Sequence, residues 1–292
     1  MIRRLISLAI SLVCRAWMRV ADGLRGLLGR GCRDECVVLY YHGASDQQVE
    51  RFRQQMKWLA AHTTVIPLSR AAEAGNGLRT CITFDDGLDS VRRNALPVLR
   101  ELRLPATVFV VAGNLGRRPA WSIPANSSER DEVLSSAEQL REFPPELIEI
   151  GSHTMTHPNL RKLAAVEVRR ELAVSKRMLE EMLDRPVASF AVPFGECHAE
   201  TFTLAAEAGY RAVVTCEPRT VRPGDSLIGA GRFKVTPDDS MLEFRLKVVG
   251  AYRWRRLWRN LRGVSVGAEA TAIALASGKA ASGTATEGAS RG

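Results

Sequence analysis

The chain has 292 residues, of which 46% are hydrophobic and 25% are charged, and its formal net charge is +9. Such a chain can bury a large core, and its composition is typical of a globular enzyme rather than of a disordered or fibrous protein. Residues 1–36 hold seven Arg against three acidic residues (+4), residues 245–262 hold seven Lys or Arg against none (+7), and the remainder carries 9 − 11 = −2. The central part is close to neutral, so we expect no nucleic-acid partner.

Residues 1–34 form the first predicted unit, a basic amphipathic helix. Its apolar positions recur at helical spacing and its polar positions lie on the opposite face. Such a helix suits an anionic membrane surface. Two alternatives stay open: a signal or short anchor segment, which lacks a cleavage-site pattern and is too short to span a bilayer, and a helix docked on the rest of the protein. The apolar positions are Leu5, Leu8, Ala9, Leu12, Val13, Ala16, Val20, Leu24 and Leu27, and the polar ones are Arg4, Ser7, Ser11, Arg15, Asp22 and Arg25.

Residues 35–244 are predicted to form the catalytic domain, an α/β fold. Repeated β-α units favour a parallel sheet that closes into a barrel, and such barrels carry their active sites at the carboxyl ends of the strands. Strands are expected near residues 37–41, 64–66, 80–84, 107–111, 147–150, 189–192, 212–215 and 227–230. Helices are expected near 50–61, 90–102, 137–143, 164–183 and 200–208.

Two polar motifs follow strand-like runs in this domain. Asp85 and Asp86 lie where the run at 80–84 ends, and His153 and His157 follow the run at 147–150, at the start of a loop or helical turn. Two imidazoles four residues apart can point at one ion, and one carboxylate completes a three-ligand site with an open position for water. The other carboxylate is then free to act as a base. The sequence therefore predicts a divalent metal site of hydrolytic type.

The motifs resemble those of polysaccharide deacetylases of the chitin-deacetylase and nodulation-deacetylase type. Three segments carry the resemblance in the family's order, at residues 83–87, 152–160 and 190–195, and the similarity spans residues 37–232. It implies a distorted barrel of about seven strands, with Asp85 as the catalytic base. It also implies that the metal, most often zinc, is bound by Asp86, His153 and His157, and that one wall of the groove is shaped by Pro193, Phe194 and Gly195.

The deacetylation reaction also needs a general acid, which protonates the departing amine. Family members commonly carry this histidine near the end of the domain, but residues 217–292 contain none. His42 is the predicted acid because it follows the first strand, at the same barrel face as the other motifs. The alternatives are a structural role for His42 in its loop and His198 as the acid, whereas His62 is expected to be inert.

Two further residues are assigned to the substrate groove and its support. The third motif contains Ala191 and Val192, where many members carry an arginine that orients the base. Arg232, at the end of a late strand, is predicted to reach the same carboxylate from another direction. Trp121, in the long loop at 113–136, is predicted to stack on a sugar ring, with a purely structural role as the alternative.

The C-terminal segments complete the predicted organisation. Residues 245–262 are expected to form a basic helix rich in Trp and Arg, which suits a membrane interface, a protein interface or closure of the barrel. Residues 263–292, rich in Ala, Ser, Gly and Thr, are expected to be a disordered tail. The six cysteines show no metal-binding spacing. Reduced thiols favour a cytoplasmic or peripheral inner-membrane location over secretion.

The main functional prediction is a metal-dependent hydrolase that removes N-acetyl groups from an amino-sugar polymer or a lipid-linked oligosaccharide. Two alternatives stay open. One is a hydrolase of a small cyclic amide on the same fold. The other is a catalytically silent barrel that binds glycan or recruits an assembly complex, an alternative motivated by the missing motif arginine and the missing terminal histidine.

Overall fold

The computed structural model describes residues 2–28, 34–123 and 128–257. Its centre is one curved nine-stranded sheet in which every pairing between named strands is parallel. The strand order is β8-β7-β6-β5-β4-β3-β1-β9, and β2 pairs with β3 beside this path. The strands are β1 Cys36–Tyr41, β2 Thr64–Val65, β3 Arg79–Phe84, β4 Ala106–Val110, β5 Ile148–Ser152, β6 Ser189–Ala191, β7 Ala212–Val214, β8 Ile228–Ala230 and β9 Phe233–Lys234.

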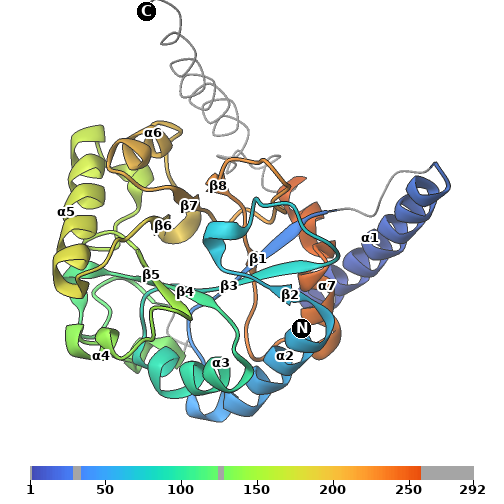
Figure 1. Ribbon diagram of the computed structural model, residues 1–292, viewed down its shortest axis with the longest axis horizontal. Helices are drawn as coiled ribbons and strands as arrows, with labels where there is room; N and C mark the ends of the chain where they lie inside the picture. The colour runs from blue at the N-terminus through green and yellow to red at the C-terminus, as the bar shows by residue number, and fades with distance from the viewer. Residues whose placement is uncertain (1, 29–33, 124–127, 258–292) are drawn as a thin grey trace, which may run out of the picture.

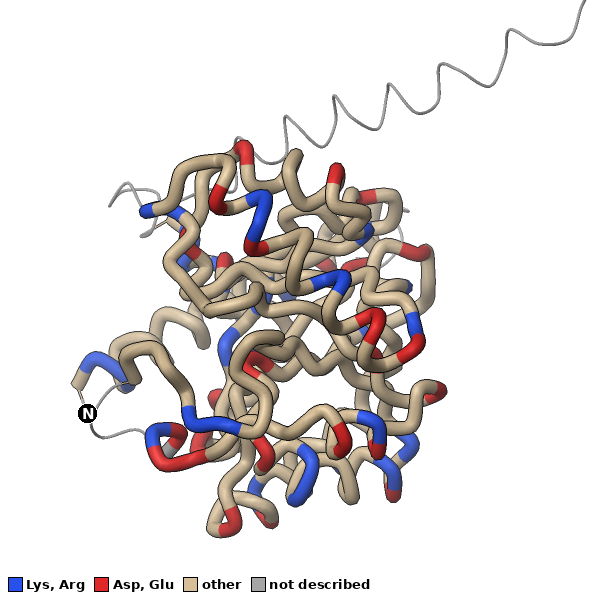
Figure 2. The backbone as a smooth tube through the Cα atoms, turned by 90° about the vertical axis from the view of Figure 1, so that its left-hand side faces the viewer, with Lys and Arg blue, Asp and Glu red and all other residues tan. Residues whose placement is uncertain are grey.

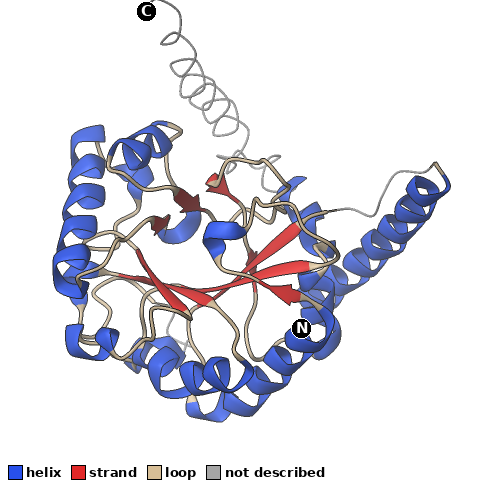
Figure 3. Cartoon of the chain, in the orientation of Figure 1, coloured by secondary structure: helices blue, strands red, loops and turns tan. Residues whose placement is uncertain are grey.

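Helices cover the outer side of this sheet (Figures 1 and 3). All six residues of β1 and of β3 are buried, as expected for parallel strands packed on both faces. The α/β half-barrel confirms the predicted fold class, and its seven strands of three or more residues, β1 and β3–β8, agree with the expected number. The covering helices are α2 Val49–His62, α3 Leu96–Leu102, α4 Ala137–Arg141, α5 Ala165–Leu183 and α6 Glu200–Glu207, with a π-helical stretch, Val91–Ala95, before α3.

In the described part of the chain, the sheet does not close into a complete barrel. A seam remains between its two edge strands, β8 and β9. β8 pairs with β7 and β9 pairs with β1, yet only Gly231 and Arg232 separate β8 from β9 in the sequence. The chain therefore crosses the seam in two residues. A side chain at position 231 would lie 2.4 Å from the carbonyl oxygen of Glu217, so only glycine allows this close approach.

The N-terminal helix α1, Ile2–Leu27, packs against the C-terminal part of the described chain. Its neighbours are α7, Met241–Val248, and the 3-10 turn η8, Ala251–Trp254. Figure 1 shows α1 (dark blue) leaning on α7 and extending away from the barrel. In the three described ranges of the chain, no helix combines the length and the apolar character needed to cross a membrane.

The basic helix expected over residues 245–262 is not continuous, and this prediction needs correction. α7 ends at Val248, and Gly250 takes a left-handed conformation (φ 69°) before η8 begins. Phe244, Leu246 and Val248 are buried, so α7 covers the barrel as the closing helix that the sequence left as one alternative. The end of the expected helix, 258–262, and the expected tail, 263–292, lie outside the described residues.

The charges of the barrel are mixed. Figure 2 shows basic and acidic residues interspersed along the chain, in agreement with the nearly neutral central part of the sequence.

Candidate metal site and active site

The candidate residues gather at the carboxyl end of the sheet. The backbone N–H of Asp85 donates to Tyr41 O (2.9 Å) and that of His153 donates to Val110 O (2.8 Å), so the hydrogen-bond ladder continues just past β3 and β5. His42, Pro193 and Arg232 follow β1, β6 and β8. Parallel strands end at one edge, and this edge therefore collects residues from five of them.

Asp86, His153 and His157 form a buried three-ligand cluster. Their donor atoms all lie within 4.8 Å of one another. Asp86 Oδ1 is 3.5 Å from His153 Nε2 and 3.4 Å from His157 Nε2. Two ligands that share a tetrahedral zinc ion at about 2.0–2.1 Å stand about 3.3 Å apart. The spacing therefore fits one shared divalent ion.

An unpaired buried oxygen in the cluster supports the same assignment. Within the described ranges, Asp86 Oδ1 has no hydrogen-bond partner. A buried carboxylate oxygen without a partner costs free energy unless a cation completes it. Burial alone would raise the pKa of Asp86, but the imidazoles of His157, His42 and His153 outweigh it and hold that pKa at about 2. The carboxylate is ionised, as a metal ligand must be.

His153 is oriented by a backbone carbonyl. Its Nδ1 lies 2.8 Å from the oxygen of Ala191, the last residue of β6. A proton on Nδ1 donates to that carbonyl, which leaves the lone pair of Nε2 directed at Asp86. Burial lowers the pKa of His153 to about 4, so the imidazole is neutral at pH 7. A neutral imidazole is the form that binds a metal.

Residues 153–157 form a loop, and the helical-turn alternative is wrong. Thr154 and His157 have positive φ values of 71° and 59°, which lie outside the right-handed helical region. Glu171 of α5 holds the loop, because its Oε2 accepts the N–H groups of Met155 (2.8 Å) and Thr156 (2.9 Å). Its Oε1 accepts the Thr156 hydroxyl (2.8 Å). The sequence analysis missed Glu171, which looks like one more charged position on an amphipathic helix.

Arg232 holds Asp85 in a buried two-point ion pair. Its Nη1 and Nη2 donate to Asp85 Oδ1 (2.7 Å) and Oδ2 (2.9 Å), and its Nε donates to Thr215 O (3.2 Å). The guanidinium also lies over the rings of Tyr40 and Phe109. Burial would raise the pKa of Asp85, but Arg232 and His153 outweigh it and keep that pKa below its usual value.

The burial of Arg232 corrects one part of the sequence prediction. Arg232 was expected both to support Asp85 and to belong to the substrate groove. Its side chain is 0% exposed, so it cannot contact a substrate. It positions the carboxylate from behind, where many family members use a motif arginine.

Strained backbone is concentrated at the site. Six non-glycine residues have positive φ values in the described ranges, and four of them lie here: Asp86, Thr154, His157 and Phe194. The other two, Arg103 and Asp184, end helices. Left-handed conformations of non-glycine residues cost free energy and persist where the surroundings enforce them. Such clustering is typical of functional sites.

The three remaining histidines lie in different surroundings. His42 is partly buried, with Nδ1 3.6 Å from Glu129 Oε1, and it is close enough to lower the pKa of both Asp85 and Asp86. His198 is exposed and contacts the carbonyl of Arg161 (2.9 Å). His62 stacks on Trp58 and bonds its carbonyl oxygen. His42 is therefore the histidine that the fold brings beside the cluster.

Two aromatic side chains flank His157. Trp121 stacks on its ring with centroids 4.2 Å apart, and Phe194 meets it edge-on at 4.6 Å. Phe194 is 47% exposed and Trp121 is partly exposed, whereas Pro193 and Gly195 are buried and shape the turn. The structure thus brings Trp121 and Phe194 together beside the metal cluster.

The comparisons with known proteins agree with this geometry. A family model of polysaccharide deacetylases matches residues 74–213. A chitooligosaccharide deacetylase of Sinorhizobium fredii is 30% identical over 166 residues, which cover 55% of this chain and 69% of the relative. The chain belongs to the polysaccharide deacetylase family. It is thus an enzyme of the hydrolase class.

Two further matches extend the family relationship. A poly-beta-1,6-N-acetyl-D-glucosamine N-deacetylase of Staphylococcus aureus is 22% identical over 202 residues, which cover 64% of this chain and 67% of the relative. The solved structure of IcaB from Ammonifex degensii superposes with a TM-score of 0.60 at 26% identity, covering 75% of this chain and 97% of that one. The segment matched by the family model contains Asp85, Asp86, His153 and His157. His42 and Arg232 lie outside it.

Proposed function

We propose that the chain is a metal-dependent hydrolase that removes N-acetyl groups from an amino-sugar polysaccharide or from a lipid-linked oligosaccharide. The observation that carries the proposal is the convergence of Asp86 Oδ1 with two imidazole Nε2 atoms, at 3.5 and 3.4 Å, in front of a carboxylate held by Arg232. Relatives named as deacetylases of chitooligosaccharides and of poly-beta-1,6-N-acetyl-D-glucosamine support an amino-sugar substrate.

Asp86, His153 and His157 would hold the divalent cation. Two imidazole nitrogens and one carboxylate oxygen favour zinc, with a position left for water. When bound, the ion polarises the acetamide carbonyl and acidifies that water. The Ala191 carbonyl and Glu171 keep the two imidazoles in place through their ring and loop contacts.

Asp85 is the proposed base. Arg232 occupies one lone pair on each oxygen of this carboxylate, so further lone pairs remain to accept a proton from the attacking water. The ion pair fixes the carboxylate plane and keeps it ionised. His153 contributes to the lowered pKa of Asp85, so the base lies near the residues that would hold the cation.

His42 is the proposed general acid. Its imidazole lies on the β1 side of the cluster, with Nδ1 3.6 Å from Glu129 Oε1. A protonated imidazole in this place donates its proton to the departing amine of the sugar. Asp85 and His42 then divide the two proton transfers that amide hydrolysis requires.

The exposed aromatic surface of Trp121 and Phe194 is the proposed sugar platform. Both rings already contact His157, so a sugar stacked there would hold its acetamide beside the cation. One of the two reasons for the alternative of a catalytically silent barrel was the missing arginine of the third motif. Arg232 supplies that positive charge to Asp85, so this reason no longer holds.

Acetate release from N-acetylglucosamine oligomers with β-1,4 and β-1,6 linkages tests the proposal. Release should stop after chelation, return with Zn²⁺ and be abolished in Asp85→Asn. Asp89→Asn is the control, since Asp89 pairs with Arg92 outside the cluster. O-acetylated glycans in the same panel separate ester from amide substrates. A zinc-loaded protein that binds these oligomers without releasing acetate would be a silent binder, and one that opens only a cyclic imide would be a different hydrolase.

A further inference from the structure

The side of α1 that docks on the protein is mixed, because it buries Ser11 and Met18 and packs Leu8 against the core. Ser11 is fully buried, and its hydroxyl accepts the indole N–H of Trp254 (2.9 Å). Arg4 donates to Glu243 Oε2 (2.7 Å) and to the carbonyl of Asp238 (2.9 Å). Surface helices ordinarily bury their apolar stripe. On α1, by contrast, most of the large apolar residues remain exposed.

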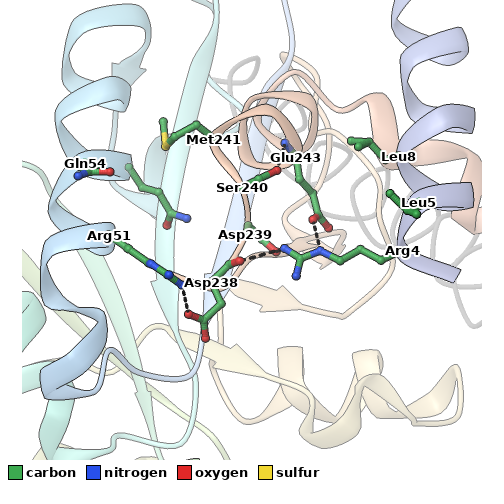
Figure 4. Close-up of a pocket in the computed structure, with 11 residues that line it drawn as sticks. Arg4, Leu5, Leu8, Arg51, Gln54, Asp238, Asp239, Ser240, Met241 and Glu243 are labelled. Atoms are coloured by element: carbon green, nitrogen blue, oxygen red, sulfur yellow. Dashed lines mark hydrogen bonds and ion pairs between the residues drawn. The ribbon is translucent and has the colours of Figure 1, made fainter. Parts of the chain in front are cut away.

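Figure 4 shows where this attachment begins. Arg4 reaches from α1 toward Glu243 and Asp239, with Leu5 and Leu8 on the same helix, across a cleft of about 510 Å³. On the other side of the cleft, Arg51 of α2 pairs with Asp238. The cleft contains none of the candidate active-site residues in its lining. Its charged side chains are paired with one another.

The outward face of α1 is strongly apolar. Val13 is 70% exposed and Trp17 is 71% exposed. In the described ranges, fifteen large hydrophobic residues are exposed, and ten of them belong to residues 2–28. Such a concentrated apolar surface marks a contact site for a partner or a membrane. The ten are Ile2, Leu5, Ile6, Leu12, Val13, Trp17, Val20, Leu24, Leu27 and Leu28.

Arginines border this apolar face on both edges. Successive helix residues are about 100° apart, which places Ile2 and Val20 on one line along the middle of the face. Arg3 and Arg19, both exposed, then lie about 100° to either side of that line. Only one residue of α1, Asp22, is acidic, and it lies on the docked side.

This charge pattern selects among the surfaces that could cover the face. A second copy of the helix would bring arginines against arginines with no carboxylate at either edge. In an anionic bilayer, the apolar residues of the helix would contact the acyl chains. The arginines at its edges would contact the phosphates, which lie nearer the surface of the bilayer. The pattern is therefore complementary to an anionic lipid surface.

We propose that α1 lies in the headgroup region of an anionic bilayer, with Val13 and Trp17 facing the acyl chains, while its other side stays docked on α7 and η8. Membrane binding then orients the whole barrel. Residues 238–243, which hold Arg4, follow β9 and so lie at the carboxyl end of the sheet, the end that carries the candidate active site. The first turn of α1 thus lies at this end of the barrel, and η8, whose Arg253 pairs with Glu35 just before β1, contacts the helix further along.

Flotation with phosphatidylglycerol/phosphatidylcholine vesicles tests the proposal on the full chain. The wild type should float, the Val13→Asp/Trp17→Asp variant should lose binding at least tenfold, and Arg3→Gln and Arg19→Gln should each weaken it about fivefold. Val166→Asp is the matched control, because Val166 is also 70% exposed but lies on α5. Circular dichroism and thermal unfolding verify that each variant is folded. A folded Val13→Asp/Trp17→Asp variant that still floats would overturn the proposal.

The docking geometry has its own readout. Lipids brominated in the acyl chain should quench Trp17 but not Trp254, which faces the protein side of the helix. Trp17→Phe should therefore lose the quenching while Trp254→Phe keeps it, and the opposite result would overturn the orientation. If the wild type forms dimers in the absence of vesicles and Val13→Asp dissociates them, a second copy of the chain covers the face. Acetate release from soluble oligomers should be unchanged in Val13→Asp, so failure here is distinguishable from failure of the proposed reaction.

Discussion

The guanidinium of Arg232 and the carboxylate of Asp85, 147 positions apart in the sequence, form a buried pair with two hydrogen bonds of 2.7 and 2.9 Å. The pair places a permanent positive charge behind the proposed base. Asp85 follows the end of β3, directly before the proposed metal ligand Asp86. The arginine therefore supports the reaction without contacting the substrate.

Replacement of Arg232 by methionine should damage both stability and rate. A buried carboxylate that loses its partner destabilises the fold by about 3–5 kcal/mol, and a misplaced base slows the reaction about 100-fold. Urea unfolding and kcat for acetate release measure the two effects. Arg79→Met is the control, because buried Arg79 pairs with Asp34 at the opposite end of β3. That variant should lose stability and keep kcat, and an equal loss of kcat in both would show that Arg232 acts through stability alone.

The clamp that Glu171 places on the histidine loop should control metal affinity. In Glu171→Ala the N–H groups of Met155 and Thr156 lose their acceptor, and His157 is no longer held. We expect the Kd for Zn²⁺ to rise about tenfold, measured by competition with a chromogenic chelator. Glu167→Ala removes a similar backbone acceptor from the same helix, at Ala164, and should leave zinc affinity unchanged. Equal affinities in the two variants would contradict the role of Glu171.

Zinc should stabilise the protein through Asp86. An ion at 100 times its Kd adds about 2.7 kcal/mol to the free energy of unfolding, which raises Tm by about 5–10 °C in a domain of this size. Differential scanning fluorimetry with and without Zn²⁺ measures the shift. It should vanish in Asp86→Asn and persist in Asp89→Asn. A shift that survives in Asp86→Asn would place the cation elsewhere.

The docking of α1 should weaken in acid. Burial would raise the pKa of Glu243, but Lys247 and Arg4 outweigh it and lower that pKa below the usual value. Because the folded pKa lies below the unfolded one, the stabilisation is complete above the unfolded value of about 4.3 and disappears as the pH falls through the folded pKa. Glu243→Gln should therefore cost about 1–2 kcal/mol at pH 7 and progressively less below pH 4.

Urea unfolding of the wild type and of Glu243→Gln at pH 7, 4 and 3 measures this difference. Glu146→Gln, at an exposed position, should show no such pH-dependent difference. If the gap between wild type and Glu243→Gln stays constant over this range, ionisation of Glu243 does not hold the helix.

Much of the fold is predictable from hydrophobic runs, and the reason is local. The eight expected strands agree with the observed ones to within two residues at every end, because most of the runs are bounded by polar or turn residues. β9, Phe233–Lys234, was missed although the equally short β2 was expected, because β9 follows β8 after only two residues, too few to separate the two strands in the sequence. It exists only because β1 stands beside it.

The site was predictable in its residue types and less so in its geometry. The motifs indicated Asp86 and the two histidines, but a spacing of four residues fits a helical turn as well as a loop. The segment forms a loop because Thr154 takes a left-handed conformation and Glu171 accepts a hydrogen bond from the backbone N–H of Met155. These depend on packing against α5, which sequence periodicity does not describe.

The helix α1 shows the same limit. Its two faces were visible in the sequence, but the side that docks depends on Glu243 and Trp254, more than 230 positions away. Only the folded chain brings these partners to Arg4 and Ser11. The amphipathic pattern alone therefore could not show which face is left outward.

The short crossing at Gly231 and Arg232 couples the opening of the barrel to the position of Arg232 in the active site. A link of two residues has almost no slack, so the edges formed by β8 and β9 cannot separate without pulling the guanidinium away from Asp85. Loss of catalytic power would then be the earliest sign that the sheet is beginning to spread.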